Sequence, residues 1–468
     1  MTHKKIIILG AGISGLSCAY FLKKGGADVT VLEAAAEAGG AMQSKRIDGF
    51  LVERGPNSTQ ETTPLFDEIV RGLKLEGERI YAEDTARYRY ILRDGELHAM
   101  PLNPPTFLKT KLFSLKAKLR LLAEPFIGKA EGEESIAQFV ERRLGPEFLD
   151  YAINPFVAGV YAGDPKQLSV RHAFPKLHAL EENYGGLFKG MLAKKREGKR
   201  KKEKGKIEES AQSEQSQKSV VQTAPGGEMF SFKNGMGTLS KALADSLGDN
   251  LHLNSPVEKV FKNGEKFIVQ TPNASFEADA VVIALPAYVA SELLKDFSQG
   301  TAAVLKNIVH PPVCEVVMGF KKDQVERSLD GFGFLIPEKE NRRILGCIWS
   351  SSIFKNRAPE GFVEVTTFVG GTPNSDIGRE PDDVLKRIVA EELRELLKIS
   401  GEPHFTHISR WERAIPQYRL GYGEVLKALD AFEKENAGMY FCSNFRGGVS
   451  VGDCVKSGFA MAERVLKG

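Results

Sequence analysis

Three glycines near the start of the chain have the spacing of a loop that binds phosphate groups. In the stretch GAGISG, Gly10 permits a tight turn, and Gly12 leaves room for a pyrophosphate to approach the backbone. Gly15 lets the next helix lie close to a sheet, and the first turn of that helix, with Ile13 and Ser14, would point its dipole at the phosphates. The pattern predicts a dinucleotide-binding site.

An acidic residue follows one helix and one strand later. Glu33 ends the apolar run DVTVLE and precedes Ala34. A carboxylate at this position can accept hydrogen bonds from ribose hydroxyls and would repel a 2′-phosphate. The order of strand, glycine loop, helix, strand and acid therefore favours FAD or NAD over NADP as the ligand.

The elements that must position these residues indicate a buried parallel sheet. Residues 5–9 form a continuous apolar run of the kind found in strands covered on both faces. The chain has 468 residues, 42% of them hydrophobic and 27% charged, so two or three globular domains are expected. No apolar run is long enough for a membrane span, and no signal-peptide pattern opens the chain, which favours a cytoplasmic protein.

Neither a metal site nor a disulfide framework is indicated by the cysteines and histidines. The five cysteines are an odd number and contain no CxxC pair. His404 and His407 form the one close histidine pair, in an alternating stretch without a third ligand nearby. We therefore expect free thiols and no bound metal.

The positive charge of the chain is concentrated in one segment. Residues 194–206, KKREGKRKKEKGK, hold nine Lys and Arg against two Glu, while the whole chain has a formal net charge of +3. The polar stretch that follows lacks aromatic residues and buries too little surface to order itself. We expect a disordered basic and polar insertion at 194–225. Attachment to nucleic acid or anionic lipid is the less favoured alternative, and we expect no nucleic-acid partner.

A second basic segment, residues 104–126, has helical periodicity. Five Lys and Arg residues lie between leucines that recur at spacings of three and four. The leucines are Leu108, Leu112, Leu115, Leu119 and Leu122. The pattern predicts a basic amphipathic helix, which would either pack its leucines on the protein or rest on an anionic membrane surface.

Motifs at both ends of the chain resemble the FAD-binding domain of the flavin amine oxidase superfamily. They are the glycine loop with Glu33, the segment AAAEAGGAMQSKRIDGFLVERGPNS, the middle segment ADAVVIALPA at 278–287, and the C-terminal NFRGGVSVG. The resemblance implies noncovalent FAD and a domain assembled from three pieces, although Cys442 lies near the position of covalent attachment in some relatives. The implied FAD contacts beyond the loop are Glu33, Ala34, Gly39, Gly40, Gly55, Pro56, Asn57, Val257, Trp411, Val449, Ser450 and Val451.

Segments between the FAD pieces resemble the protoporphyrinogen oxidase family, especially its plant-type and mitochondrial-like members. The matching segments are residues 150–165 and 331–371, together with NFRGGVSVG, and the resemblance covers nearly the whole chain except residues 194–219. It implies that Arg89 meets a propionate of the substrate. It also implies that the macrocycle lies among Gly159, Leu335, Ile348 and Phe368.

This second resemblance implies an oxidoreductase of haem or chlorophyll biosynthesis. The enzyme would oxidise protoporphyrinogen IX to protoporphyrin IX with oxygen or another acceptor. The flavin would perform the chemistry, so we expect no catalytic side chain. A coproporphyrinogen III oxidase of the Gram-positive type is the nearest alternative, and Arg89 favours the two-propionate substrate. A flavin-free binding protein on the same fold is an alternative of another class.

The expected fold class is α/β, with a Rossmann-like FAD-binding domain, an α+β substrate domain and a helical membrane-binding domain. We expect the FAD-binding domain at 1–75, 226–292 and 408–468, and the substrate domain at 293–407. The helical domain is expected at 76–193. Peripheral attachment to the cytoplasmic membrane and a possible homodimer complete the expectations.

Overall fold

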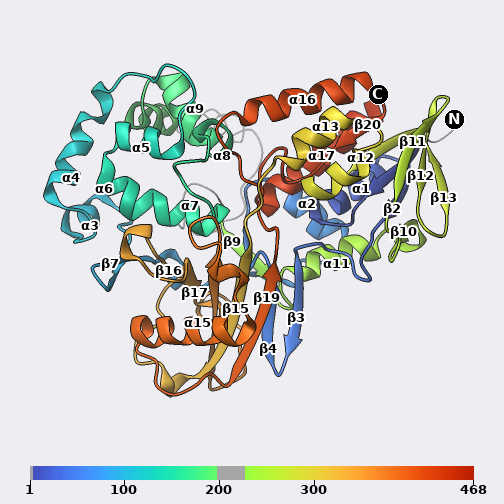
Figure 1. Ribbon diagram of the computed structural model, residues 1–468. Helices are drawn as coiled ribbons and strands as arrows, with labels where there is room; N and C mark the ends of the chain where they lie inside the picture. The colour runs from blue at the N-terminus through green and yellow to red at the C-terminus, as the bar shows by residue number, and fades with distance from the viewer. Residues whose placement is uncertain (1–3, 198–226, 468) are drawn as a thin grey trace, which may run out of the picture.

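The computed structural model describes residues 4–197 and 227–467. The basic insertion expected at 194–225 therefore lies outside the described residues from position 198 onward. Figure 1 shows three regions: a nucleotide-binding part that contains both ends of the chain, a large, mostly antiparallel sheet below it, and a helical part beside both.

A five-stranded parallel sheet forms the centre of the nucleotide-binding part. Its strand order is β10-β2-β1-β14-β20. The strands are β1 (Lys5–Leu9), β2 (Asp28–Leu32), β10 (Leu251–His252), β14 (Ala280–Ile283) and β20 (Met439–Phe441). Three separated stretches of the chain supply these strands, so the expected assembly from three pieces is confirmed for this sheet.

Helices cover both faces of the parallel sheet. Alternate residues of β1 pack with α1 (Ile13–Lys24) and α17 (Val451–Lys467) on one face, and with α12 (Ala287–Leu294) and α13 (Gln299–Lys306) on the other. The strand therefore buries side chains of both alternations, which explains its continuous apolar run. The helix α1 begins at Ile13, inside the glycine motif, and so places its N-terminus at the carboxyl end of β1.

Smaller elements surround this core. Three small antiparallel sheets, β3-β4, β5-β9-β6 and β11-β12-β13, lie around it, and α2 and α11 pack nearby. These elements are β3 (Gln43–Ile47), β4 (Phe50–Arg54), β5 (Thr59–Gln60), α2 (Leu65–Gly72), β6 (Arg79–Tyr81), β9 (Met229–Phe232), α11 (Gly237–Asp245), β11 (Lys259–Asn263), β12 (Lys266–Gln270), β13 (Ser275–Ala278) and α16 (Tyr422–Glu435).

A seven-stranded sheet forms the second layer, with the order β19-β15-β18-β17-β16-β7-β8. Its outer face is covered by α15 (Asp382–Leu397), whose leucines pack with alternate residues of the long strand β15. The strands are β7 (Arg89–Arg93), β8 (Glu96–Ala99), β15 (Val313–Lys321), β16 (Gly333–Leu335), β17 (Gly346–Ile348), β18 (Phe362–Gly370) and β19 (Phe405–Trp411), with α14 (Ser350–Ile353) after β17. The other face points toward α7 (Asn154–Tyr161) and the nucleotide-binding part.

This sheet corrects two expected domain boundaries. The strands β7 and β8 lie within the segment 76–193 that was expected to be helical, yet β7 pairs with β16 of the substrate part. The strand β19 crosses position 408, where the third FAD segment was expected to begin. Strand pairing joins residues far apart in sequence, so segment composition alone could not locate these boundaries.

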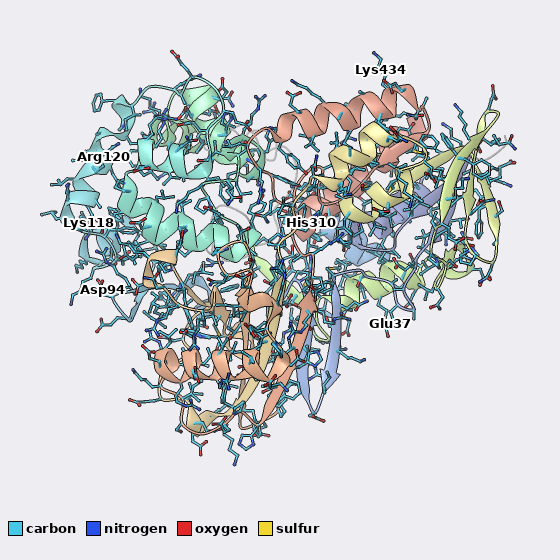
Figure 2. The ribbon with its side chains drawn as sticks, in the orientation of Figure 1. Glu37, Asp94, Lys118, Arg120, His310 and Lys434 are labelled. Carbon is cyan, nitrogen blue, oxygen red and sulfur yellow. The ribbon has the colours of Figure 1, made fainter. Side chains whose placement is uncertain are left out.

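The helical part consists of short helices joined by tight turns. The helices are α3 (Pro104–Lys109), α4 (Leu115–Arg120), α5 (Ile136–Arg143), α6 (Pro146–Phe148), α7 (Asn154–Tyr161), α8 (Val170–Ala173) and α9 (Pro175–Tyr184). Figure 2 shows Lys118 and Arg120 at the outer edge of this part. None of the helices in the described ranges is both long and apolar enough to cross a membrane.

The single amphipathic helix expected at 104–126 is wrong. The segment contains α3, a break, α4 and a 3-10 turn at Leu121–Phe126. Ser114 caps α4 by accepting a hydrogen bond from the Ala117 N–H, which starts a new helix. Leu112 lies in the break and is fully buried, so it does not belong to an exposed stripe.

Candidate active site

The first glycine loop has the geometry that its spacing predicts. Gly10 has a φ of +100°, and a Cβ built on Gly15 would lie 2.1 Å from the Gly10 carbonyl oxygen. Only glycine fits at these two positions without displacing the backbone. Gly12 differs, because its φ is −74° and a Cβ there would meet no atom within 4 Å. The open space at Gly12 is therefore available to a ligand and is not needed for packing.

A second glycine pair lies directly against this loop. The Gly39 N–H donates a 2.8 Å hydrogen bond to the Ala11 carbonyl, and a Cβ on Gly40 would lie 3.2 Å from the Cα of Gly12. Gly55 has a φ of +102°, and its Cβ would meet the Ala41 carbonyl oxygen at 2.3 Å. Backbone from three loops thus converges with few side chains between, which suits an extended cofactor.

The Glu33 carboxylate reaches the same loop. Its Oε2 accepts a 2.7 Å hydrogen bond from the Ala11 N–H, and its Oε1 accepts a 2.9 Å bond from the Ala35 N–H. The Ser255 N–H donates to the Glu33 carbonyl, which brings the segment containing Val257 beside this end of the site. Ala34 is exposed next to Glu33. This arrangement leaves the carboxylate close to where a ribose would follow the phosphates.

The C-terminal turn is held by two buried tyrosines that the sequence analysis missed. The Tyr418 hydroxyl accepts a 3.1 Å hydrogen bond from the Gly448 N–H and donates to the Asn444 carbonyl. The Tyr422 hydroxyl donates a 2.6 Å bond to the Phe445 carbonyl. The two rings lie 4.6 Å apart between centroids. Together they fix the turn that leads into α17.

Ser450 and its neighbours open the last helix. The Ser450 Oγ accepts a hydrogen bond of 3.1 Å from the Asp453 N–H and donates one of 2.7 Å to the Asp453 carboxylate. Val449 is partly buried and Val451 is buried in the core beneath the turn. Cys442 is also buried in this core, with its Sγ 3.9 Å from the Ser14 carbonyl oxygen. The thiol therefore packs under α1 and away from the open loop.

The residues after β4 connect the glycine loops to the large sheet. The Asn57 side-chain amide donates a 3.2 Å hydrogen bond to the Gly55 carbonyl, across Pro56. The Arg54 guanidinium lies 5.3 Å from the centroid of the Trp411 ring, which comes from the end of β19. This contact brings Trp411 to the same region as the predicted flavin-binding segment.

Strand register brings the predicted substrate residues onto one face of the seven-stranded sheet. Leu335 pairs with Gly346, which pairs with Phe368 on the next strand. In the adjacent row, Arg89 pairs with Gly333, which pairs with Ile348. Paired residues point to the same side of a sheet. Four predicted residues from four strands therefore share one face.

The fifth predicted residue covers this face from α7. A Cβ on Gly159 would lie 2.7 Å from the Cδ2 of Leu335, so the absence of a side chain lets helix and strand meet. Phe156 and Val160, on the same side of α7, expose 45% and 39% of their surface. These two were not predicted, although their spacing around Gly159 on a helix was visible in the sequence.

Arg89 stands out on this face as a cation without a carboxylate. Its guanidinium lies 5.0 Å from the centroid of the Phe332 ring. The residue is exposed, and no hydrogen bond or ion pair joins its side chain to another residue of the described ranges. An arginine that is open to solvent at the edge of an apolar face is suited to hold an anionic group.

The chain resembles flavoenzymes over its whole length. A family model described as flavin containing amine oxidoreductase matches residues 13–466. The mitochondrial protoporphyrinogen oxidase of Nicotiana tabacum is 33% identical, covering 99% of this chain and 95% of that protein. The coproporphyrinogen III oxidase of Bacillus subtilis is 28% identical, covering 99% and 98%. A crystal structure of a proposed protoporphyrinogen oxidase from Exiguobacterium has a TM-score of 0.81 at 23% identity, covering 100% and 99%.

These comparisons and the converging glycine loops define the class of this protein. The chain belongs to the flavin-containing amine oxidoreductase family and is a flavin-dependent oxidoreductase with FAD as its cofactor. Within that family it groups with the protoporphyrinogen oxidases. The expected family, the α/β fold with its FAD-binding domain and the cofactor are confirmed, while membrane binding by the helical part stays a prediction; the alternative of a flavin-free binding protein is not supported.

Proposed function

We propose that this protein oxidises protoporphyrinogen IX to protoporphyrin IX in tetrapyrrole biosynthesis, with oxygen or another acceptor receiving the electrons. The observation that carries the proposal is the shared sheet face of Arg89, Leu335, Ile348 and Phe368, with Gly159 of α7 packed against Leu335. Relatives named protoporphyrinogen oxidase that cover 99% and 100% of the chain support it.

The chemistry of this face matches the substrate. Protoporphyrinogen IX is a large, mostly apolar macrocycle with two propionates at one edge. Leu335, Ile348 and Phe368 offer an apolar wall, and Gly159 lets α7 lie close to Leu335 at one part of that wall. Arg89 would hold a propionate through its planar guanidinium, which can grip both carboxylate oxygens. The propionates of the substrate would thus bind Arg89, while its apolar macrocycle would lie against the apolar side chains.

Bound FAD supplies a two-electron acceptor for hydride. The residues of the chain bind and orient the reactants. The glycine loops and Glu33 hold the nucleotide half noncovalently, while Tyr418 fixes the turn before α17. The apolar sheet face excludes water, and Arg89 would set the orientation of the macrocycle by anchoring one edge. A fixed orientation presents the same ring carbon to the flavin in each of three two-electron rounds, so the double bonds must rearrange around the ring between rounds.

Coproporphyrinogen III is the second candidate substrate. Relatives named coproporphyrinogen III oxidase, from Bacillus subtilis and Staphylococcus aureus, cover 99% of the chain at 28% and 30% identity. That substrate carries four carboxylates, which require more cations at the pocket edge. Arg89, the cation that the proposal places at this edge, favours the substrate with two.

Peripheral membrane attachment through the helical part belongs to the same proposal. Exposed apolar side chains cluster on α4 and the turn after it, namely Leu115, Leu119, Leu122 and Phe126. Beside them, a cavity of about 710 Å³ is lined by Arg93, Lys116, Arg120 and Lys339, together with Glu147 and Asp150. Apolar side chains next to an excess of cations suit an anionic lipid surface. A homodimer at the cytoplasmic membrane remains part of the expectation.

Substrate choice tests the proposed function directly. Purified protein loaded with FAD is offered protoporphyrinogen IX and coproporphyrinogen III in parallel, and porphyrin fluorescence is followed. We expect a higher kcat/KM for protoporphyrinogen IX by at least about tenfold, equal to about 1.4 kcal/mol. A preference of the same size for coproporphyrinogen III would replace the first candidate with the second.

A further inference from the structure

Three polar side chains on the inner face of the large sheet have buried atoms that make no close hydrogen bond. They are Glu315 on β15 and Ser409 and Trp411 on β19. The Glu315 Oε2, the Ser409 Oγ and the Trp411 Nε1 have no hydrogen-bond partner among the described residues. Buried polar atoms are almost always closely hydrogen-bonded, so a group of three without a close hydrogen bond needs an explanation.

Strand register places Glu315 beside the proposed substrate wall. Glu315 pairs with Phe368 on β18 and with Ser409 on β19, so the three side chains share one row and one face. The same row continues through Gly346 to Leu335. The carboxyl is therefore the nearest titratable neighbour of Phe368 across the strand pair.

The other side of Glu315 meets the flavin-binding segment. Its carboxyl lies beside the backbone N–H of Gly55 and the indole N–H of Trp411. The charged neighbours are Glu53 and Arg54 of β4, and no cation forms an ion pair with Glu315 in the described ranges. Glu315 thus occupies the junction between the proposed substrate face and the predicted FAD contacts.

The environment makes this carboxyl exchange protons near neutral pH. Burial, with a smaller contribution from Glu53, raises the pKa of Glu315 to about 8, although the N–H groups of Gly55 and Trp411 and the charge of Arg54 oppose the rise. A general base is most effective when its pKa lies near the working pH. A carboxyl buried at a junction of cofactor and substrate segments is a candidate for such a role.

We propose that Glu315 is the proton acceptor of this site, an inference that rests on the proposed porphyrinogen oxidation. In one two-electron round a C–H bond of a bridging carbon breaks and its electron pair leaves as hydride to bound FAD. A pyrrole N–H bond breaks, its electron pair enters the ring as a new double bond, and its proton goes to the Glu315 carboxylate. The electron pair then passes to oxygen. The proton held by Glu315 and the hydrogen that was transferred as hydride leave with it, and the product is hydrogen peroxide.

The sequence offers a matched control at Glu364 on β18. Glu364 is as deeply buried as Glu315, its Oε2 also lacks a partner, and burial raises its pKa well above the usual value. Its main charged neighbour is Arg357, whereas Glu315 lies beside Gly55 and Trp411. Glu364→Gln therefore removes a buried carboxyl from the same sheet without touching the junction.

The first measurement is a pH titration of the flavin absorbance of the holoenzyme without substrate. We expect a spectral transition near pH 8 in the wild type and in Glu364→Gln, and its loss in Glu315→Gln. The absence of that transition from the wild-type holoenzyme would overturn the inference, and this result needs no variant that folds. A transition that persists in Glu315→Gln would overturn it equally.

The second measurement separates this inference from the proposed function. With protoporphyrinogen IX, Glu315→Gln should lower kcat by about a hundredfold, leave KM within about threefold, and remove the rise of kcat with pH that the wild type shows below about pH 8. Oxidation at the wild-type rate and pH dependence would refute the role of Glu315 and leave the function intact. The remaining outcome is a flavin transition that depends on Glu315 in a protein that oxidises no porphyrinogen. That result would refute the proposed function and the proton transfer, and it would show only that Glu315 titrates beside the flavin.

Discussion

The open space at Gly12 makes a clean prediction about FAD binding. Gly12→Val places a branched side chain where the backbone meets no atom within 4 Å, at a φ of −74° that valine adopts readily. The fold should therefore lose little stability. The cofactor should lose one or two hydrogen bonds between backbone N–H groups and phosphate, each worth about 1.5–3 kcal/mol. FAD affinity should fall by at least about tenfold for one bond, and about a hundredfold for two.

The matched control is Gly15→Ala, which adds one methyl group to the same loop. That methyl would lie 2.1 Å from the Gly10 carbonyl oxygen, so the backbone must shift, at a cost of about 1–3 kcal/mol or more. Thermal unfolding of the apoprotein and fluorescence titration with FAD measure the two effects separately. Gly12→Val should lower affinity and keep the melting temperature, whereas Gly15→Ala should lower the melting temperature. Unchanged FAD affinity in Gly12→Val would refute the assignment of the loop.

Three further variants test other parts of the site. Arg89→Ala should raise KM for protoporphyrinogen IX by about tenfold to a hundredfold and leave kcat within a few fold, because the contact stabilises the ground state and the transition state equally. Arg89→Lys should restore only part of the lost substrate affinity. An unchanged KM with a collapsed kcat would remove Arg89 from the pocket edge. Leu115→Glu combined with Leu119→Glu should weaken binding to anionic liposomes by at least about tenfold in flotation, and equal binding would show that these leucines do not meet the lipid. Tyr418→Phe should weaken FAD binding by about tenfold, and Tyr422→Phe should weaken it less, because the Tyr418 hydroxyl bonds two backbone groups of the turn and the Tyr422 hydroxyl bonds one. Equal FAD affinities of the two variants would show that this turn does not support the cofactor.

The nucleotide loop could be read from the sequence because its requirements are local. Gly10 and Gly15 are needed for steric reasons within six residues of chain, and the strand and helix that flank them follow from hydrophobic pattern alone. The substrate face could be proposed only through family resemblance. Its members come from four strands, and their shared orientation depends on register, which no local pattern specifies.

The leucine pattern shows where periodicity misleads. Leucines at spacings of three and four fit one long helix, but the helix is broken before the Ser114 cap. The break directs the Leu112 side chain into the core and leaves Leu115 and Leu119 exposed. Glu315 was missed for the opposite reason, since a lone acid within the apolar strand PVCEVVMGF gives no spacing to interpret. Its isolation among buried residues was nevertheless a visible signal, because unpaired charges rarely lie inside a sheet.

A single-turnover reaction without oxygen tests the central claim most directly. The FAD-loaded protein is mixed with protoporphyrinogen IX under anaerobic conditions, and flavin absorbance and porphyrin fluorescence are followed together. We predict that the flavin absorbance bleaches, and that the bleaching slows when Arg89→Ala is mixed with subsaturating substrate. A flavin that stays oxidised with both protoporphyrinogen IX and coproporphyrinogen III would contradict the assignment of this sheet face to a porphyrinogen.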